Sequence, residues 1–381
     1  MDNNTRSNPA NLSFWEHNHL FAQVDFCIVG AGIVGLHTAL FLKQQQPTAK
    51  ILVLEKSPIG AAASSKNAGF ACFGSVSEIL DDIELNGSEM AYELIKMRWD
   101  GLQLLINVHG SDTVGFEKTG GYELFRKKDQ ELYHKCAELI PELNKNLDFI
   151  GSDVYSTKAS SYPFRNIEWQ ISTSFEGQID TTKMYFNLEH KALNQGILIL
   201  RGFEVKTFQD TGAAVEIEIN PGIVFKTRQL AITNNGFAAS LLPKADVKPA
   251  RAQVLVTEPI PGFELNGTFH YDKGYYYFRN CGNRLLIGGG RNVNFVAEET
   301  TEQRITEEIQ NSIEELMYNI LLKEPVKIDF RWAGTMGIGM TKYPIIEQIS
   351  NRVFCGVRMG GMGVAIGALV GKKLSDLISK T

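Results

Sequence analysis

The pattern of apolar and polar residues near the N-terminus predicts a strand, a helix and a second strand. Residues 24–29 (VDFCIV) form a short apolar run that is typical of a buried strand. An apolar helix is predicted over about residues 36–42, and Pro47 lies just beyond its end. Residues 51–54 (ILVL) predict a second buried strand, which Glu55 closes. A strand, a helix and a strand within about 30 residues make one βαβ unit.

Helical and strand patterns alternate less regularly through the middle of the chain. Helical periodicity covers residues 80–108 and 127–147, and Pro141 is expected to break the second helix. Residues 115–125 predict strands around a glycine turn, and residues 251–290 are again rich in strand patterns. Because these segments lack the βαβ rhythm, we assign them to a second domain.

The βαβ rhythm returns after residue 179. Asp180 can cap a helix that extends to about residue 194, and residues 197–200 predict a buried strand. Apolar residues alternate with glutamates over residues 215–219, which predicts one strand of a hairpin with a solvent-exposed face.

The last part of the chain predicts an amphipathic helix, a strand and a final helix. Apolar residues three and four apart run from Ile305 to Ile320, and Thr300 with Gln303 is expected to form the capping box of this helix. Residues 353–356 predict a strand, and a glycine-rich loop then leads into a helix near the C-terminus.

This order predicts an α/β protein with a Rossmann-like nucleotide-binding domain and an inserted α+β substrate domain whose sheet is mainly antiparallel. The nucleotide-binding domain would be discontinuous, over residues 1–76, 174–242 and 329–381. The substrate domain would then comprise residues 77–173 and 243–328.

Composition narrows the class of protein. The chain of 381 residues is 44% hydrophobic, which is enough for a large core, and its net charge of −5 without a long basic run argues against nucleic-acid binding. The five cysteines form no C-x-x-C pair and predict reduced thiols of a cytoplasmic protein. Residues 1–23 do not resemble a signal peptide, and no apolar stretch is long enough for a membrane span. The seven scattered histidines predict no metal site.

The candidate chemistry begins at the turn between the first strand and helix, where Gly30, Gly32 and Gly35 form a G-x-G-x-x-G fingerprint. Such glycines allow a tight turn, the approach of a pyrophosphate and close packing of helix on strand, while the helix N-terminus attracts phosphate. Glu55 lies 20 residues after Gly35 and can accept both ribose hydroxyls. Ile33, Val34 and Lys56 flank these positions and are also predicted to contact the cofactor. The fingerprint alone does not separate FAD from NAD.

A segment of small and polar residues follows the second strand, at residues 61–69 (AAASSKNAG). Small side chains let the backbone pass close to a ligand, and the hydroxyl, ammonium and amide groups can contact phosphate or ring atoms. The predicted cofactor contacts in this segment are Ala62, Ala63, Ser64, Ser65, Lys66, Asn67, Ala68 and Gly69.

These motifs resemble the D-amino-acid oxidase family of flavoproteins. The G-A-G-I-V-G run with Glu55 and the A-A-S-S-K-N-A-G run match the family's N-terminal motifs, and residues 202–205, 331–334 and 361–364 resemble later ones in the same order. The resemblance implies non-covalent FAD as the cofactor. It adds the following cofactor residues: Val205, Asn234, Asn235, Gly236, Gly334, Arg358, Met359, Gly360, Gly361, Met362, Gly363 and Val364.

The resemblance also implies where substrate binds. A family strand that lends a tyrosine to the substrate pocket corresponds to the strand carrying Tyr275, Tyr277 and Arg279, and the two tyrosines are expected to share one face. Where the glycine-oxidising branch has an arginine that binds the substrate carboxylate, this chain has Met336. Leu286 stands where relatives that use oxygen have a lysine, which favours a dehydrogenase. We therefore take Tyr275, Tyr277, Arg279 and Met336 as the candidate catalytic residues, with Arg251 and Arg291 as weaker candidates for a carboxylate clamp.

We therefore predict an FAD-dependent oxidoreductase that oxidises a C–N bond of a small amine or amino acid by hydride transfer to flavin N5. The electron acceptor, oxygen or a carrier, stays open. The alternatives are an FAD-dependent 2-hydroxyacid dehydrogenase, for which His270 is the candidate base, an NAD-linked enzyme, and a non-catalytic flavin-binding module.

Overall fold

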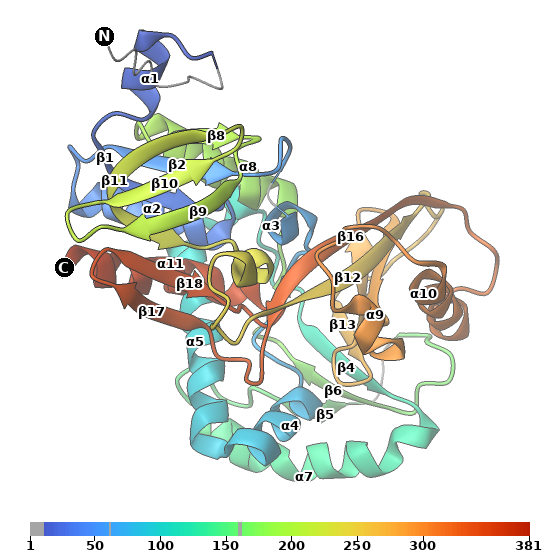
Figure 1. The fold of residues 1–381 in the computed structure, drawn as a ribbon. Coiled ribbons are helices and arrows are strands. Elements are labelled where there is room, and N and C mark those ends of the chain that lie inside the picture. The colour runs from blue at the N-terminus through green and yellow to red at the C-terminus, as the bar shows by residue number, and fades with distance from the viewer. Residues whose placement is uncertain (1–10, 61, 159–161) are drawn as a thin grey trace, which may run out of the picture.

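The computed structural model describes residues 11–60, 62–158 and 162–381, and it folds into two parts that are each built around one sheet (Figure 1). Residues 1–10, at the start of the predicted nucleotide-binding domain, lie outside the described residues. So does Ala61, the first residue of the predicted cofactor segment (residues 61–69). None of the described helices combines the length and the apolar character that crossing a bilayer requires.

The first sheet contains the predicted βαβ unit. Strand β1 (Val24–Val29) pairs in parallel with β2 (Ile51–Glu55), and α2 (Ile33–Gln45) connects them. The apolar runs of both strands are almost completely buried, as their composition predicts. Helix α2 is buried over most of its length because α11 (Gly363–Ser379) covers it.

The neighbours of β1 and β2 come from distant parts of the chain. Strand β8 pairs in parallel with β2, and β11 pairs in parallel with β1. The sheet order is β17-β18-β11-β1-β2-β8, and β9 and β10 extend it from β11. Their bounds are β8 Leu198–Arg201, β9 Val205–Asp210, β10 Val215–Ile219, β11 Ile223–Ile232, β17 Ile345–Ser350 and β18 Val353–Val357. The predicted hairpin is confirmed, because β10 and β11 are antiparallel.

Three glycines let long helices pack against one another behind this sheet. A Cβ atom at Gly101 of α5 (Ser88–His109) would overlap the Ala365 carbonyl oxygen of α11, and one at Gly371 would lie 2.5 Å from the His37 Cβ atom. One at Gly367 would lie 2.7 Å from Ile33. Helix α8 (Thr181–Asn194) also packs on α2, and the Asp180 side chain caps it as predicted.

The second sheet is antiparallel except where β13 and β4 run parallel. Its order is β16-β12-β15-β14-β13-β4-β6-β5. The strand bounds are β4 Gly121–Phe125, β5 Ser156–Lys158, β6 Trp169–Thr173, β12 Lys248–Thr257, β13 Thr268–Tyr271, β14 Tyr276–Cys281, β15 Arg284–Gly289 and β16 Ile328–Ile338. The mainly antiparallel character predicted for the inserted part is therefore confirmed.

The remaining elements are short, or they cover the second sheet. Their bounds are α1 Phe14–Leu20, α3 Ala62–Lys66, β3 Phe70–Ala71, α4 Val76–Asn86, α6 Ser111–Val114, η1 Lys127–Asp129, α7 Gln130–Asn146, β7 Gly177–Gln178, η2 Asn235–Ser240, η3 Arg291–Val293, α9 Phe295–Glu298 and α10 Glu307–Ile320. Strands β3 and β7 form a small separate sheet. We propose that the parts built around the two large sheets are the two predicted domains. The pairing of β16 with β12 then places residues 328–338 with the second sheet rather than the first.

Several local predictions were wrong. Pro141 lies inside α7 and does not break it, and Gly87 divides the predicted 80–108 helix into α4 and α5. Residues 115–125 contain one strand, β4, preceded by an isolated bridge at Glu117. Tyr275 lies in the turn before β14, not on the strand.

The predicted capping box at Thr300 and Gln303 was also wrong. Helix α10 begins only at Glu307, with Thr306 as its N-cap residue. The Thr300 hydroxyl instead accepts the backbone N–H of Glu302.

Candidate cofactor and substrate site

The three fingerprint glycines adopt the geometry that the motif predicts. Gly30 has φ +103°, which favours glycine, and a Cβ atom at Gly35 would overlap the Gly30 carbonyl oxygen. A Cβ atom at Gly32 would lie 2.9 Å from the Ser64 hydroxyl. The backbone can therefore turn sharply from β1 into α2, and Gly32, the N-cap residue of α2, lines a cavity beside the helix N-terminus.

Glu55 ends β2 next to this turn and is only 6% exposed. Its Oε2 accepts the Ala31 N–H at 3.0 Å, and its Oε1 accepts the Ser57 N–H at 2.9 Å. These two bonds fix the carboxylate beside the glycine turn. Each carboxylate oxygen has a further lone pair that can accept a ribose hydroxyl.

A cavity of about 300 Å³ lies in front of the glycine turn and extends between the two sheets. The predicted cofactor residues that line it are Gly30, Gly32, Glu55, Lys56, Ala62, Ala63, Ser64, Val205, Asn234, Asn235 and Gly236. Its lining also includes residues that were not predicted: Val29, Leu54, Phe203, Glu204, Thr233, Phe237, Ala239, Ser240, Pro249, Thr301 and Thr335.

The other predicted cofactor residues do not line this cavity, although several contact residues that do. Among the described residues they are Ile33, Val34, Gly35, Ser65, Lys66, Asn67, Ala68, Gly69, Gly334, Arg358, Met359, Gly360, Gly361, Met362, Gly363 and Val364. Their roles stay predictions.

Polar atoms of the cavity lining fit a dinucleotide. Within the described part of the chain, Asn234 Oδ1 and Thr335 Oγ1 are buried without a hydrogen-bond partner. Both residues line the cavity, so a ligand there can satisfy them. Lys56 Nζ lies 3.4 Å from the centre of the Phe237 ring, on the same lining. The ammonium, amide and hydroxyl groups in this set can bind phosphate and ribose, and the aromatic ring can pack against a base.

Hydrogen bonds hold the small-residue segment, which contains α3, against both parts of the protein. The Ile33 N–H at the start of α2 donates to the Ser64 hydroxyl at 3.0 Å. Trp332 Nε1 of β16 donates to the Lys66 carbonyl at 2.9 Å. Asn67 has a local role, since its side-chain oxygen accepts the Gly69 N–H and the Thr181 hydroxyl. The segment therefore joins the first sheet to β16.

The C-terminal glycine loop is tied to the Asn235 turn. Asn235 Oδ1 accepts the backbone N–H groups of Arg358 and Met359 at 3.0 and 3.2 Å. The Gly360 N–H donates to the Gly337 carbonyl, so the backbone N–H of this predicted cofactor residue is not free for a ligand. Met336 lies beside the same loop, with its sulfur 3.4 Å from the place of a Cβ atom at Gly361.

One row of the second sheet runs beneath the cofactor segment. Cross-strand partners in register from β4 to β16 form it: Glu123, His270, Tyr277, Gly288, Val254 and Trp332. The Phe70 ring, just after the cofactor segment, meets the rings of His270 and Tyr277 edge-on at 5.2 and 5.4 Å. Burial raises the pKa of Tyr277 to about 12, so its hydroxyl stays protonated.

The structure separates the two predicted tyrosines. The Tyr275 ring contacts Phe295 at 5.5 Å and lies near the Arg291 guanidinium, whereas Tyr277 packs with Phe70, Leu286 and Trp332. The expectation that both tyrosines share one strand face was therefore wrong.

The three candidate arginines already have partners. Arg279 is 7% exposed and donates to the carbonyl oxygens of Ala68, Ile179 and Asn280 and to the Gln178 side chain. This arginine therefore positions the cofactor segment. Arg251 forms a buried bidentate ion pair with Glu298. Arg291 stacks on Phe295, and burial lowers its pKa.

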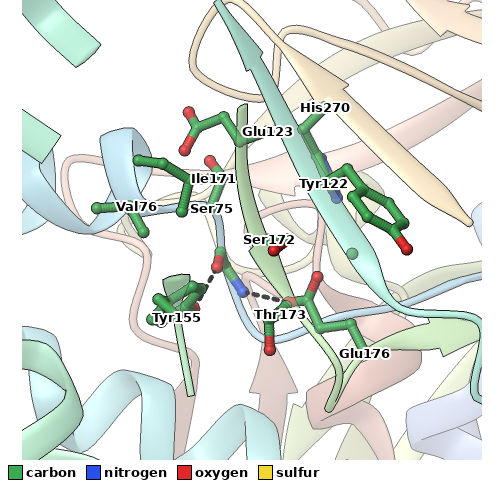
Figure 2. A pocket seen from close by; sticks show the side chains of 12 residues that line it. Ser75, Val76, Tyr122, Glu123, Tyr155, Ile171, Ser172, Thr173, Glu176 and His270 are labelled. Carbon is green, nitrogen blue, oxygen red and sulfur yellow. Dashed lines mark hydrogen bonds between the residues drawn. The ribbon is translucent and has the colours of Figure 1, made fainter. Parts of the chain in front are cut away.

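A second, much smaller cavity of about 10 Å³ lies under β4 and β6 and is lined by Glu123, Glu176 and His270 among others (Figure 2). It is about the size of one water molecule. Within the described residues, Ser75 Oγ and His270 Nε2 line it without a hydrogen-bond partner. Burial raises the pKa of Glu123 to about 7 and of Glu176 to about 8, and it lowers the pKa of His270 to about 4. His270 thus faces an interior polar cluster rather than the large cavity.

A Rossmann-type glycine turn beside a mainly antiparallel sheet is the arrangement of a dinucleotide-dependent enzyme. The sequence model of the FAD dependent oxidoreductase family, DAO, matches residues 25–377. The chain therefore belongs to this family, and its cofactor is FAD.

Individual proteins agree with the assignment. The chain is 22% identical to the probable oxidoreductase OrdL of Haemophilus influenzae, with 93% of this chain and 82% of that protein covered. It is also 22% identical to gamma-glutamylputrescine oxidoreductase of Escherichia coli, with 93% and 83% covered. The crystal structure of glycine oxidase from Geobacillus kaustophilus superposes with a TM-score of 0.77 at 16% identity, covering 94% of this chain and 95% of that one. This structural similarity shows that the two proteins share a fold.

Proposed function

We propose that this protein oxidises a C–N bond of a small amine, with secondary or larger amines preferred over simple α-amino acids. Membership in the family supplies the cofactor and the redox class. The similarity to gamma-glutamylputrescine oxidoreductase and to glycine oxidase, whose names both denote nitrogen-containing substrates, supports a C–N bond as the target.

The surroundings of Met336 carry the proposal for the substrate. On β16, Trp332, Gly334 and Met336 share one face, because side chains two apart along a strand point the same way. Gly334 packs against Lys66 and Ala63 of the cofactor segment, and Met336 contacts the C-terminal loop at Gly361. We infer that a substrate bound beside FAD meets this face as an aromatic and thioether wall.

Two of the three arginines that could bind a substrate carboxylate in place of the missing one are held elsewhere, and the third, Arg291, stacks on Phe295. Arg251 is paired with Glu298, and Arg279 is bound to backbone carbonyls. A buried carboxylate without a cationic partner is costly, whereas Tyr277 and Trp332 can attract a cationic or N-substituted amine by cation–π contact. The interior therefore favours amines.

Amine oxidation demands little acid–base chemistry from the protein. FAD, when bound, accepts a hydride at N5. The protein has to orient a neutral amine and exclude water, and placement alone can supply much of the rate. Oxidation of a 2-hydroxyacid would need a base at the substrate hydroxyl. His270, the candidate for that base, lines the small interior cavity, which supports the amine hypothesis.

The test is anaerobic reduction of the bound flavin by a panel of amines, amino acids and 2-hydroxyacids, followed by loss of flavin absorbance. We expect one or more secondary or extended amines to reduce the flavin much faster than glycine, D-alanine or lactate. Faster reduction by a hydroxyacid would contradict the proposal. A flavin that no compound in the panel reduces would point to the non-catalytic module.

A further inference from the structure

The segment between α9 and α10, residues 299–306, lies against the mouth of the FAD cavity. Thr301 of this segment lines the cavity and is itself exposed, so it lies at the rim. Pro249 of β12 and Thr335 of β16 line the same side. We call residues 299–306 the strap.

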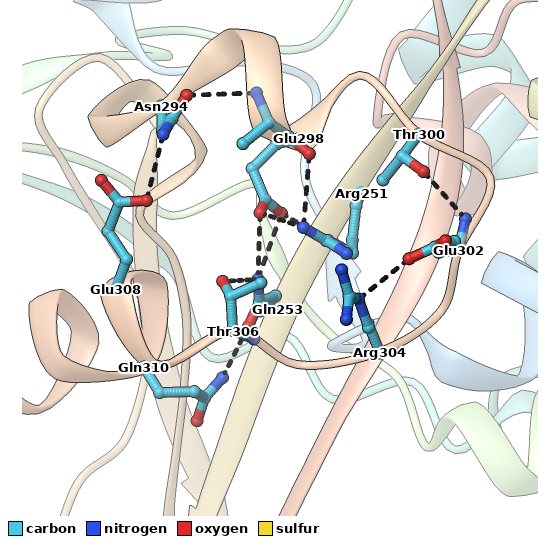
Figure 3. Close-up of polar contacts among 11 residues, drawn as sticks. Arg251, Gln253, Asn294, Glu298, Thr300, Glu302, Arg304, Thr306, Glu308 and Gln310 are labelled. Atoms are coloured by element: carbon cyan, nitrogen blue, oxygen red, sulfur yellow. Dashed lines mark hydrogen bonds and ion pairs between the residues drawn. The ribbon is translucent and has the colours of Figure 1, made fainter.

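Both ends of the strap are fixed to one side chain of β12 (Figure 3). Just before the strap, Glu298 is 1% exposed and accepts from Arg251 at 2.6 and 2.9 Å and from Gln253 Nε2 at 3.2 Å. At the other end, the Thr306 N–H donates to Gln253 Oε1 at 2.9 Å, and Gln253 Nε2 donates to the Thr306 hydroxyl at 2.8 Å. The buried ion pair of Glu298 therefore anchors the chain just before the strap, and the hydrogen bonds of Thr306 anchor its last residue.

The middle of the strap is held differently. Thr301, Glu302, Arg304 and Ile305 are exposed, and Gln303 is half-buried. Gln303 Oε1 accepts from Lys66 Nζ at 2.6 Å. Lys66 belongs to α3, and Ala63 and Ser64 of that helix also line the cavity. The Lys66–Gln303 bond thus joins the strap to a helix of the cavity lining.

We propose that the strap retains FAD, with the bond between Lys66 and Gln303 as its latch and Thr301 as a rim contact. FAD leaves the cavity when the middle of the strap parts from α3, while the Glu298 and Thr306 anchors keep its ends in place. This role rests on the family's cofactor and is independent of which substrate the enzyme oxidises.

The first experiment measures how fast FAD leaves the purified holoenzyme, from the rise in free-flavin fluorescence after the holoenzyme is diluted so far that released FAD does not rebind. Gln303→Ala should release FAD roughly tenfold faster, since a hydrogen bond to an ammonium group is lost. The matched control is Glu302→Ala, because among the described residues the Glu302 carboxylate forms an ion pair with Arg304 alone, and both side chains are more than 60% exposed. A Gln303→Ala release rate equal to that of wild type or of the control would overturn the proposal.

Two further measurements separate a latch from a general structural effect. In a Lys66→Met background, Gln303→Ala should add no further acceleration, because the bond is already absent; an additive effect would refute the latch. Trypsin should cut after the exposed Arg304 faster in the apoprotein than in the holoenzyme. Equal cleavage rates would show that FAD does not hold the strap closed.

Discussion

The sulfur of Met336 lies 3.4 Å from the place that a Cβ atom on Gly361 would occupy, so the second sheet meets the C-terminal glycine loop at this methionine. Its backbone also approaches Gly236, where an added Cβ atom would overlap the Met336 carbonyl oxygen. Met336 therefore contacts two segments that the sequence associates with FAD, and a change in its side chain should alter substrate choice.

Met336→Arg should raise kcat/KM for glycine relative to the best amine by roughly tenfold or more, because a guanidinium can pair with a carboxylate in a bidentate way. Met336→Leu, which keeps an apolar wall, should leave the ratio near that of wild type. Steady-state kinetics with both substrates measure the ratio. If wild type already oxidises glycine as efficiently as any amine, the argument from Met336 is wrong.

Glu55→Ala should weaken FAD binding by roughly 10- to 100-fold, the cost of losing hydrogen bonds to a charged acceptor. FMN has no adenosine ribose, so its affinity should change little. Titration of the apoprotein with each flavin tests the difference. Since Glu55 also accepts the Ala31 and Ser57 N–H groups on its two oxygens, thermal unfolding of the Glu55→Ala apoprotein is the control for local disruption. Equal losses for FAD and FMN would exclude a contact with the ribose.

Glu176→Gln should make stability less dependent on pH. Burial raises the pKa of Glu176 from 4.5 to about 8, so the folded protein binds a proton that the unfolded chain releases. Its stabilising effect is complete below about pH 4.5 and is lost as the pH rises through 8. The backbone N–H groups of Phe73 and Gly74, which donate to Glu176, can still donate to the glutamine oxygen.

Thermal unfolding midpoints of the holoprotein in excess FAD, measured from pH 5 to pH 9, test this prediction. The unfolding midpoint of Glu176→Gln should rise relative to that of wild type as the pH rises. The midpoint of Glu307→Gln, an exposed change at the start of α10, should not. A constant difference across the range would mean that Glu176 is ionised in the folded protein.

Acid denaturation should release the flavin into the supernatant. Residues 336–340 contain no cysteine that could form a thioether to the ring. Absorbance near the flavin maximum, read in the supernatant and in the pellet, decides the matter. Colour that remains with the precipitated protein would show a covalent bond.

The sequence predicted well what depends on neighbouring residues. The βαβ unit, the glycine turn and the place of Glu55 follow from one short stretch, and all are confirmed in the structure. Pro141 was misjudged because packing of Cys136, Ile140 and Leu143 into the core outweighs the hydrogen bond that proline cannot form.

What the sequence did not predict comes from tertiary contacts. Thr301, Pro249 and Thr335 reach the cavity from the second sheet and its connections, and no local pattern marks them. Likewise, Gln303 looked like a capping residue, yet its side chain contacts Lys66, which is 237 positions away in sequence. Arg251 was a candidate for binding a substrate carboxylate and Arg279 a candidate catalytic residue, because the sequence does not reveal the partners of either arginine.

The central claim is that bound FAD oxidises a C–N bond, and an anaerobic single turnover tests it most directly. The holoenzyme is mixed with one equivalent of the amine that reduces it fastest, and the products are quantified after the flavin absorbance has fallen. The account predicts one equivalent of carbonyl compound and one of released amine or ammonia for each flavin reduced. Flavin reduction that yields a carbonyl compound without an equivalent of amine or ammonia would contradict it.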